Sequence, residues 1–353
     1  MQILVIGKFY IEGFARHIAE TLEAMGHKVI RFEIGFKSGS ISGHFGQRVD
    51  KVLGVLYLSS DSIPAIREHR MKALWQVAEQ DSIDIVIVGH DFLWPTEITE
   101  LKRRTHAKVA MWCPDSLANF GRAFFMNATY DGLFFKDPYI VHAMGDVLNS
   151  PVYYLPECFN PVLHSLPEED IGNQAAYKCD ITTAGHPHTW RVEFFSHLIN
   201  YDVKMWGTQK PLWMPKGIVT ELYQKREVFN HDKVRAFRGA KMVINNLFYG
   251  EIWGVNARCF EVAGAGAFQI VDWRPCLSQL FEDGKELISF TSIADLKQKI
   301  DYWLPRDAER RVIAKAGMRR AYSEHTYQHR LSLLLATLSG SAKGFPMPEV
   351  IPN

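Results

Sequence analysis

Short, continuous apolar runs alternate with segments of helical hydrophobic spacing along most of the chain. Residues 84–88 are typical of a strand buried on both faces, whereas residues 11–25 have helical spacing that ends at Gly26. Apolar runs separated by helices indicate parallel strands in a sheet that is covered on both sides. In the first half, the pattern predicts a helix at 64–80, a long loop at 38–54, and strands at 3–6, 28–32, 84–88, 108–112, 132–135 and 152–155.

This alternation stops at residues 156–174, which contain Pro156, Pro161 and Pro167 and are typical of an interdomain linker. It restarts with predicted strands at 180–184, 203–206, 241–245 and 267–271 and helices at 188–200 and 256–264. A chain of 353 residues fits two domains of about 150 residues each. We therefore expect an α/β protein with two facing, doubly wound Rossmann-like domains, at 1–160 and 175–325, and a C-terminal helix and loose tail at 326–353.

Composition narrows the possible partners. The 40 Lys and Arg residues balance 39 Asp and Glu residues, so nucleic acid is not an expected partner. The five cysteines form no CxxC pair, which argues against zinc and dithiol chemistry. The first residues predict a buried strand and not a signal peptide, and no apolar run reaches the roughly 18 residues of a membrane span. These features predict a cytoplasmic protein without a transmembrane segment.

The most informative segment is residues 254–272, which predicts a helix followed by a strand. Arg258 and Glu261 are three residues apart and share a helix face, just after Asn256 at the expected helix start. A carboxylate in this position can accept both hydroxyls of a ribose, while arginine or the helix N-terminus faces phosphate. The alternative is a surface ion pair on an amphipathic helix.

A second segment, residues 183–191, joins a predicted strand to a predicted helix. Gly185 in this turn exposes backbone N–H groups that suit a diphosphate, and Arg191 can add a charge-assisted hydrogen bond. His186 and His188 are alternatively metal ligands, although the sequence offers no third ligand nearby. The turn lacks GxGxxG, which disfavours a nicotinamide cofactor.

Polar residues also follow the predicted strands of the first half. His90 and Asp91 follow one strand and Asp115 follows the next, so we expect all three in the same cleft. Each is a candidate general base for an acceptor hydroxyl. The alternative is that these residues cap the helices that follow.

Six groups of residues in the second half follow one another in a characteristic order. They are CDITTAG at 179–185 with Arg191, VKMWG at 203–207, KMVINN at 241–246, NARCFEVAGAG at 256–266, FEDGKE at 281–286, and AG at 316–317 with HTYQHR at 325–330. In this order they resemble the CgeB-type (spore-maturation-like) group 1 glycosyltransferases, which have the two-domain GT-B fold. The resemblance covers about residues 177–330.

The resemblance implies a nucleotide-sugar donor in the second domain, with Glu261 at the ribose and Arg191 and Arg258 at the diphosphate. It places His325 at the donor wall or at the crossover to the first domain. Many group 1 glycosyltransferases carry a sugar-contacting Glu eight positions before the ribose Glu; here that position is Trp253, and Glu251 is the candidate substitute.

We therefore expect transfer from a UDP- or dTDP-sugar to an acceptor hydroxyl of a glycan, protein or small molecule. We expect neither a metal nor another cofactor. Two alternatives share the architecture: a non-catalytic carbohydrate-binding or spore-surface protein, and a sugar-nucleotide epimerase.

Overall fold

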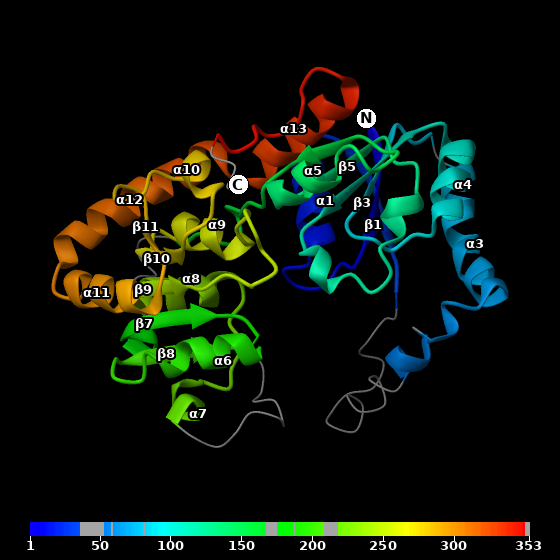
Figure 1. The fold of residues 1–353 in the computed structure, drawn as a ribbon. Coiled ribbons are helices and arrows are strands. Elements are labelled where there is room, and N and C mark those ends of the chain that lie inside the picture. The colour runs from blue at the N-terminus through cyan, green and yellow to red at the C-terminus, as the bar shows by residue number, and fades with distance from the viewer. Residues whose placement is uncertain are drawn as a thin grey trace.

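The computed structural model describes residues 1–35, 53–57, 59–80, 82–166, 175–186, 188–207 and 218–349. These residues form two parallel-sheet α/β domains, one from each half of the chain (Figure 1). The fold class predicted from the sequence is therefore confirmed. The predicted loop at 38–54 and the linker residues 167–174 lie almost wholly outside the described residues.

The first domain contains a six-stranded sheet in the order β2-β1-β3-β4-β5-β6. Its strands are β1 (Gln2–Gly7), β2 (Lys28–Glu33), β3 (Ile85–Val88), β4 (Lys108–Cys113), β5 (Gly132–Phe135) and β6 (Val152–Tyr154), all parallel. Alternate residues of β1 enter two different cores. Leu4 packs with α3 (Pro64–Gln80) and α4 (Pro95–Thr105), whereas Ile3 packs with α1 (Phe14–Ala24) and α13 (Tyr327–Ser339). The sheet is thus covered on both faces, as its continuous apolar runs require.

The second domain contains a five-stranded parallel sheet in the order β11-β10-β9-β7-β8. Its strands are β7 (Cys179–Ala184), β8 (Val203–Trp206), β9 (Ala240–Asn245), β10 (Gln269–Asp272) and β11 (Ile288–Phe290). Helices α6 (Thr189–Ser196) and α11 (Ile293–Trp303) contribute to the core on one face. Helices α8 (Asn230–Gly239) and α9 (Ala257–Gly264) cover the other face.

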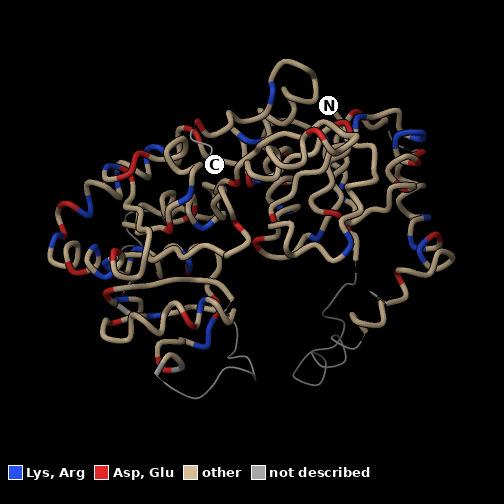
Figure 2. Tube along the Cα trace, viewed as in Figure 1, with Lys and Arg blue, Asp and Glu red and all other residues tan. Residues whose placement is uncertain are grey.

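The remaining elements are short or connect the domains. They are α5 (Pro138–Met144), α7 (Ile218–Leu222), α10 (Leu277–Leu280), α12 (Asp307–Glu324) and the short 3-10 helices Leu117–Asn119, Phe124–Asn127 and Ala175–Tyr177. No helix in the described ranges combines the length and apolarity needed to cross a membrane. Basic and acidic residues are interspersed over both domains (Figure 2).

The chain crosses between the domains twice, and the two crossings are hydrogen-bonded to each other. Phe159 donates its N–H to the carbonyl of His325 at 3.1 Å and accepts the N–H of Tyr327 at 3.2 Å. After this crossing, α13 packs on α1 of the first domain (Figure 1). His325 is fully buried and bonds the Leu280 carbonyl at 2.7 Å. It therefore belongs to the crossover and not to the donor wall.

The prediction of a loose tail after α13 is wrong for the residues up to Met347. Phe345 packs edge-on against Tyr154, and its N–H donates to the Tyr154 carbonyl at 2.8 Å. The carbonyl of Met347 accepts a hydrogen bond from Gln279 at 2.6 Å. Prolines and glycines in this segment prevent regular structure but leave the apolar side chains free to pack.

Candidate active site

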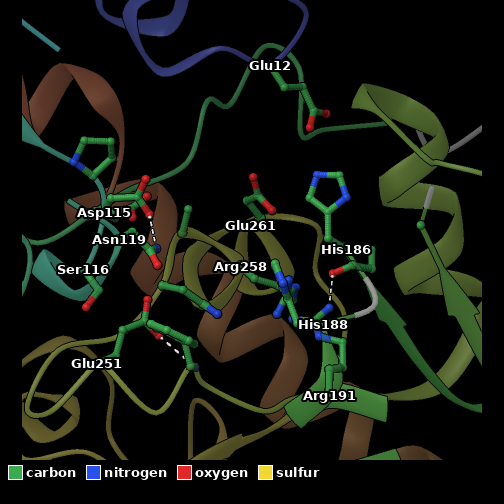
Figure 3. A pocket seen from close by; sticks show the side chains of 18 of the residues that line it. Glu12, Asp115, Ser116, Asn119, His186, His188, Arg191, Glu251, Arg258 and Glu261 are labelled. Carbon is green, nitrogen blue, oxygen red and sulfur yellow. Dashed lines mark hydrogen bonds between the residues drawn. The ribbon is translucent and has the colours of Figure 1, made fainter. Parts of the chain in front are cut away.

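A cleft of about 620 Å³ lies between the two domains, at the carboxyl ends of both sets of strands. Glu12 and Asp115 enter it from the first domain, whereas Arg258 and Glu261 enter it from the second (Figure 3). Its wall combines polar residues with the aromatic residues Trp190, Trp206, Phe229, Phe248 and Tyr249. All seven donor-site residues predicted from the sequence line this cleft: Gly185, His186, His188, Arg191, Asn256, Arg258 and Glu261.

Two arginines converge on the glycine that ends β7. Gly185 has a φ of +128°, and a Cβ there would lie 2.6 Å from Nη2 of Arg258 and 2.9 Å from Nη1 of Arg191. The positive φ disfavours any residue with a Cβ at this position, and such a Cβ would also displace both guanidinium groups. Arg191 lies in the first turn of α6 and Arg258 in the first turn of α9, so two helix N-termini point to the same place. The free backbone N–H groups of a helix N-terminus and its partial positive charge favour the binding of an anion.

These two arginines have no carboxylate within ion-pair distance among the described residues. Arg191 is 3% exposed and donates to the Ala184 carbonyl at 3.0 Å, while its Nε has no hydrogen-bond partner. Arg258 donates to Oδ1 of Asn245 at 3.1 Å. Burial and the mutual repulsion of the two guanidinium groups lower the pKa of Arg191. Burial also lowers the pKa of Arg258. The site therefore holds positive charge that a bound anion would stabilise.

Asn256 and His188 occupy the N-caps of the two helices. The Asn256 side chain accepts from the N–H of Cys259 at 3.3 Å and exchanges hydrogen bonds with Asn245. His188 precedes α6, and its ring is stacked with Trp190 at 6.2 Å. His186 lies beside His188, with the two rings 6.1 Å apart. Asn256 thus shapes the helix end, while the two histidines form part of the cleft wall.

Glu261 lies in a buried ionic cluster that the sequence did not predict. Its Oε1 is 3.1 Å from Nζ of Lys233, which also contacts Glu12 of the first domain. Burial raises the pKa of Glu261, but Lys233 and His164 outweigh this effect and lower it. Among the described residues Glu261 is thus ion-paired with Lys233 and not with Arg258, which contradicts the alternative of a surface Arg258–Glu261 pair.

The same cluster brings three possible metal ligands together. Ligand atoms of Glu12, His164 and Glu261 lie within 4.8 Å of one another, the one such group among the described residues. The ammonium of Lys233 contacts both carboxylates and supplies a cation there. A metal ion at this position would have to displace the Lys233 ammonium from the two carboxylates, and the positive charge of the ammonium would repel the ion.

The three candidate bases of the first domain have different surroundings. Asp115 lines the cleft, accepts from Asn119 at 3.2 Å, and lies 3.6 Å from Nε2 of His90. The neighbouring His90 ring is the main cause of the lowered pKa of Asp115. The ring of His90 packs against Phe92 and Phe120.

Asp91 does not line the cleft. Its two carboxylate oxygens accept the N–H groups of Phe124 at 2.7 Å and Phe125 at 2.9 Å. Asp91 therefore caps the 3-10 helix Phe124–Asn127 and not α4, the helix that follows it in the chain, and Asp115 is the better-placed base.

A second ionic group lies at the cleft floor, where the domains meet. Nζ of Lys136, at the end of β5, is 2.6 Å from Glu251 of the second domain and 3.2 Å from Glu157 of the linker. All three side chains are buried. Burial raises the pKa of Glu157 to about 7, although Lys136 acts in the opposite direction.

The residue after Lys136 binds the same loop of the second domain. Asp137 accepts the N–H of Ile252 at 2.7 Å and that of Trp253 at 3.1 Å. A Cβ on Gly254 would lie 2.9 Å from the backbone of the first domain. Trp253, at the position of the expected sugar-contacting Glu, is therefore buried against the first domain, and Glu251 faces the cleft instead.

Several site residues were missed because their sequence signals are weak. Lys136 follows a predicted strand, so its place at the cleft could have been inferred. Glu12, Glu157 and Lys233 lie in segments without a distinctive motif, and Lys233 is brought in by α8 from the far side of the cleft.

Two facing Rossmann-like domains with a cleft between them are the arrangement of the GT-B fold. Residues 189–336 match the protein-family model described as "Glycosyl transferase-like". A search of curated protein sequences gives no match. At the level of enzyme class, the prediction of a glycosyltransferase is confirmed; the CgeB-type subgroup stays a prediction.

Solved structures share the fold over nearly the whole chain. A glycosyltransferase from Rickettsia africae has a TM-score of 0.64 and 14% identity, covering 96% of this chain and 98% of its own. Sucrose-phosphate synthase from Thermosynechococcus elongatus has a TM-score of 0.64 and 11% identity, with 97% and 100% covered. Anabaena HepE in complex with UDP has a TM-score of 0.63 and 14% identity, with 96% and 100% covered. At these identities the likeness shows the GT-B fold.

The raised pKa of Glu157 predicts a pH-dependent stability. Between its ordinary value of 4.5 and about 7, the unfolded carboxyl is ionised while the folded one keeps its proton. The contribution of Glu157 to the free energy of unfolding therefore falls as pH rises through this window, and it is constant above the window. We expect Glu157→Gln to gain stability relative to wild type between pH 5 and pH 8, on the order of 1–3 kcal/mol.

Urea unfolding at pH 5, 6, 7 and 8 tests this prediction. Glu193→Gln is the matched control, because that side chain is 79% exposed on α6. Parallel pH profiles for wild type and Glu157→Gln would show that Glu157 does not titrate in this window.

Proposed function

We propose that this protein transfers a sugar from a UDP- or dTDP-sugar to an acceptor hydroxyl without a metal ion. The observation that carries the proposal is the convergence of buried Arg191 and partly buried Arg258 on Gly185, with no ion-paired carboxylate for either among the described residues. Two helix N-termini end at the same point. A diphosphate supplies the negative charge that this arrangement lacks.

The remainder of the donor extends along α9 in this proposal. Glu261 is one turn after Arg258, which places a carboxylate where the ribose follows the diphosphate. The contacts of Glu261 with Lys233 and His164 both use Oε1, so Oε2 can accept a ribose hydroxyl. The UDP and UDP-glucose complexes of Anabaena HepE, which has the same fold, support a nucleotide-sugar as the donor class.

The transfer step uses groups from both walls. The acceptor oxygen forms a bond to the anomeric carbon, and the bond from that carbon to the diphosphate oxygen breaks. Arg191, Arg258 and the start of α9 stabilise the negative charge that develops on the leaving diphosphate. Asp115 takes the acceptor proton, since its lowered pKa keeps it ionised and His90 orients it.

Metal independence follows from this distribution of charge. The arginines and helix N-termini supply the positive charge that a divalent ion supplies in other transferases. The one cluster of potential ligands among the described residues already contains the Lys233 ammonium.

A carbohydrate-binding protein without catalysis is the second candidate. It would retain the fold but would not need two unneutralised arginines in the cleft. An epimerase would need acid and base groups beside the donor sugar and would release no nucleoside diphosphate.

Arg258→Met tests the diphosphate site. We expect nucleoside diphosphate affinity to fall at least about tenfold, because a charge-assisted hydrogen bond is worth about 1.5–3 kcal/mol. The melting temperature should stay the same or rise, since the repulsion that lowers the pKa of Arg191 is removed. Calorimetric titration of UDP, dTDP and GDP measures the first effect and a melting curve the second.

Arg311→Met is the control for this change, because Arg311 is 79% exposed and lies on α12. A folded Arg258→Met protein with wild-type nucleotide affinity would rule out the diphosphate assignment.

Glu261→Gln tests the ribose contact in a double-mutant-type cycle, in which the second change removes a hydroxyl from the ligand. We expect UDP affinity to fall at least about tenfold, as one or two charge-assisted hydrogen bonds are lost. In wild type, 2′-deoxy-UDP should bind more weakly than UDP, whereas in Glu261→Gln the two should bind alike. The cycle separates the ribose contact from any general loosening of the Lys233 cluster. If the missing 2′-hydroxyl weakens binding equally in wild type and Glu261→Gln, then Glu261 has only a structural role.

Chelation tests metal independence. Nucleoside diphosphate release from UDP- and dTDP-sugars should be the same with excess EDTA as with added Mg²⁺ or Mn²⁺. Loss of turnover with EDTA and its recovery with either ion would overturn this part of the proposal.

A further inference from the structure

A smaller chamber of about 200 Å³ opens off the cleft towards the first domain. Six residues line both spaces: Glu12, Pro114, Asp115, Glu157, Ala257 and Glu261. The other lining residues are Tyr10, Phe14, His17, Cys158, His164 and Tyr327. Because ligand pockets usually exceed about 300 Å³, this acidic chamber suits one ring-sized part of a ligand.

One wall of the acidic chamber is a rigid aromatic group. Tyr327, at the start of α13, lies 5.0 Å from the His17 ring and 6.1 Å from the Phe14 ring. Phe14 packs edge-on against the buried Trp112 at 4.7 Å. The exposed ring of Tyr10 lies at the same chamber. Such faces suit the C–H surface of a sugar ring.

The polar wall is strongly biased towards carboxylates. Glu12, Asp115, Glu157 and Glu261 line the chamber, whereas Lys136 and Lys233 contact them from outside it. Hydroxyl groups donate hydrogen bonds to such a wall, but phosphates and carboxylates would be repelled by it.

One buried polar atom in the chamber lacks a partner. Nδ1 of His164 accepts the N–H of Asn160 at 3.3 Å, so Nε2 carries the proton in the neutral ring. This buried Nε2 has no hydrogen-bond partner, and it is 3.6 Å from Glu12 and 3.7 Å from Glu261. A ligand oxygen could accept a hydrogen bond from this Nε2–H. The chamber therefore offers both hydrogen-bond donors and acceptors.

We infer that the acidic chamber binds the acceptor as an uncharged, hydroxyl-bearing ring and rejects phosphorylated or carboxylated acceptors. This inference rests on the proposed sugar transfer. Asp115 forms part of the wall shared by the chamber and the cleft, so a hydroxyl in the chamber is next to the proposed base. The anionic donor is held at the arginine end and the neutral acceptor at the acidic end.

Saturation-transfer NMR on the full chain, with and without saturating UDP, tests the inference. The probes are methyl glucoside, methyl galactoside and methyl N-acetylglucosaminide, compared with their 6-phosphates and with methyl glucuronide. We expect saturation transfer to at least one neutral glycoside and none to the anionic ones. Tyr10→Ala should weaken glycoside binding at least about threefold, while calorimetry shows unchanged UDP affinity.

Tyr302→Ala is the matched control, since Tyr302 is also exposed but lies on α11 and lines neither space. The inference is overturned if anionic glycosides bind as well as neutral ones, if no neutral glycoside binds, or if Tyr10→Ala binds glycosides like wild type. A wild-type protein that binds no nucleotide would instead overturn the proposed function, whatever the glycosides do.

Discussion

The site depends on a buried contact between the end of β5 and the loop that connects β9 to α9. Lys136 and Asp137 are consecutive residues of the first domain, yet both bind this loop of the second domain. Lys136 bonds the Glu251 side chain, and Asp137 accepts two backbone N–H groups of the loop. Ser116 adds a bond to the Gly250 carbonyl at 2.8 Å. Each of these buried N–H groups would cost about 1–3 kcal/mol if left without a partner, so the contact strongly favours one domain arrangement.

This contact also determines which side chains can face the donor sugar. The first domain covers Trp253 and Gly254, and a larger residue than glycine does not fit there. Glu251 is therefore the carboxylate of this loop that reaches the cleft. Because the loop is bound to the first domain while Arg258 and Glu261 belong to α9, the two parts of the donor wall would move differently in a domain rotation. In this structure the loop and α9 together complete one wall of the cleft.

Local sequence pattern predicted the fold well, because buried parallel strands produce apolar runs whose length and spacing are hard to mistake. Strand β11 was missed, since Ser289 interrupts its short apolar run. The position of Gly185, Arg191 and Arg258 in the cleft was also predicted, because these residues lie at strand-to-helix turns that a parallel sheet brings to one edge. Glu12, Lys233, His164 and Glu157 could not be found in this way. They come from the loop after β1, from α8 and from the linker, and they meet only because the two domains pack together.

The cleft separates charge along its length, and this separation connects the fold to the chemistry. Two arginines and two helix N-termini gather at Gly185, whereas carboxylates gather where α9, the linker and the β1–α1 loop meet. The two ends are joined by α9, which carries Arg258 in its first turn and Glu261 one turn later. A nucleotide-sugar bound along this helix would have its phosphates and its ribose in opposite electrostatic surroundings. Since Asp115 borders the acidic end, the proposed transfer would move the proton of the acceptor hydroxyl towards the carboxylates, while the leaving diphosphate would stay with the arginines.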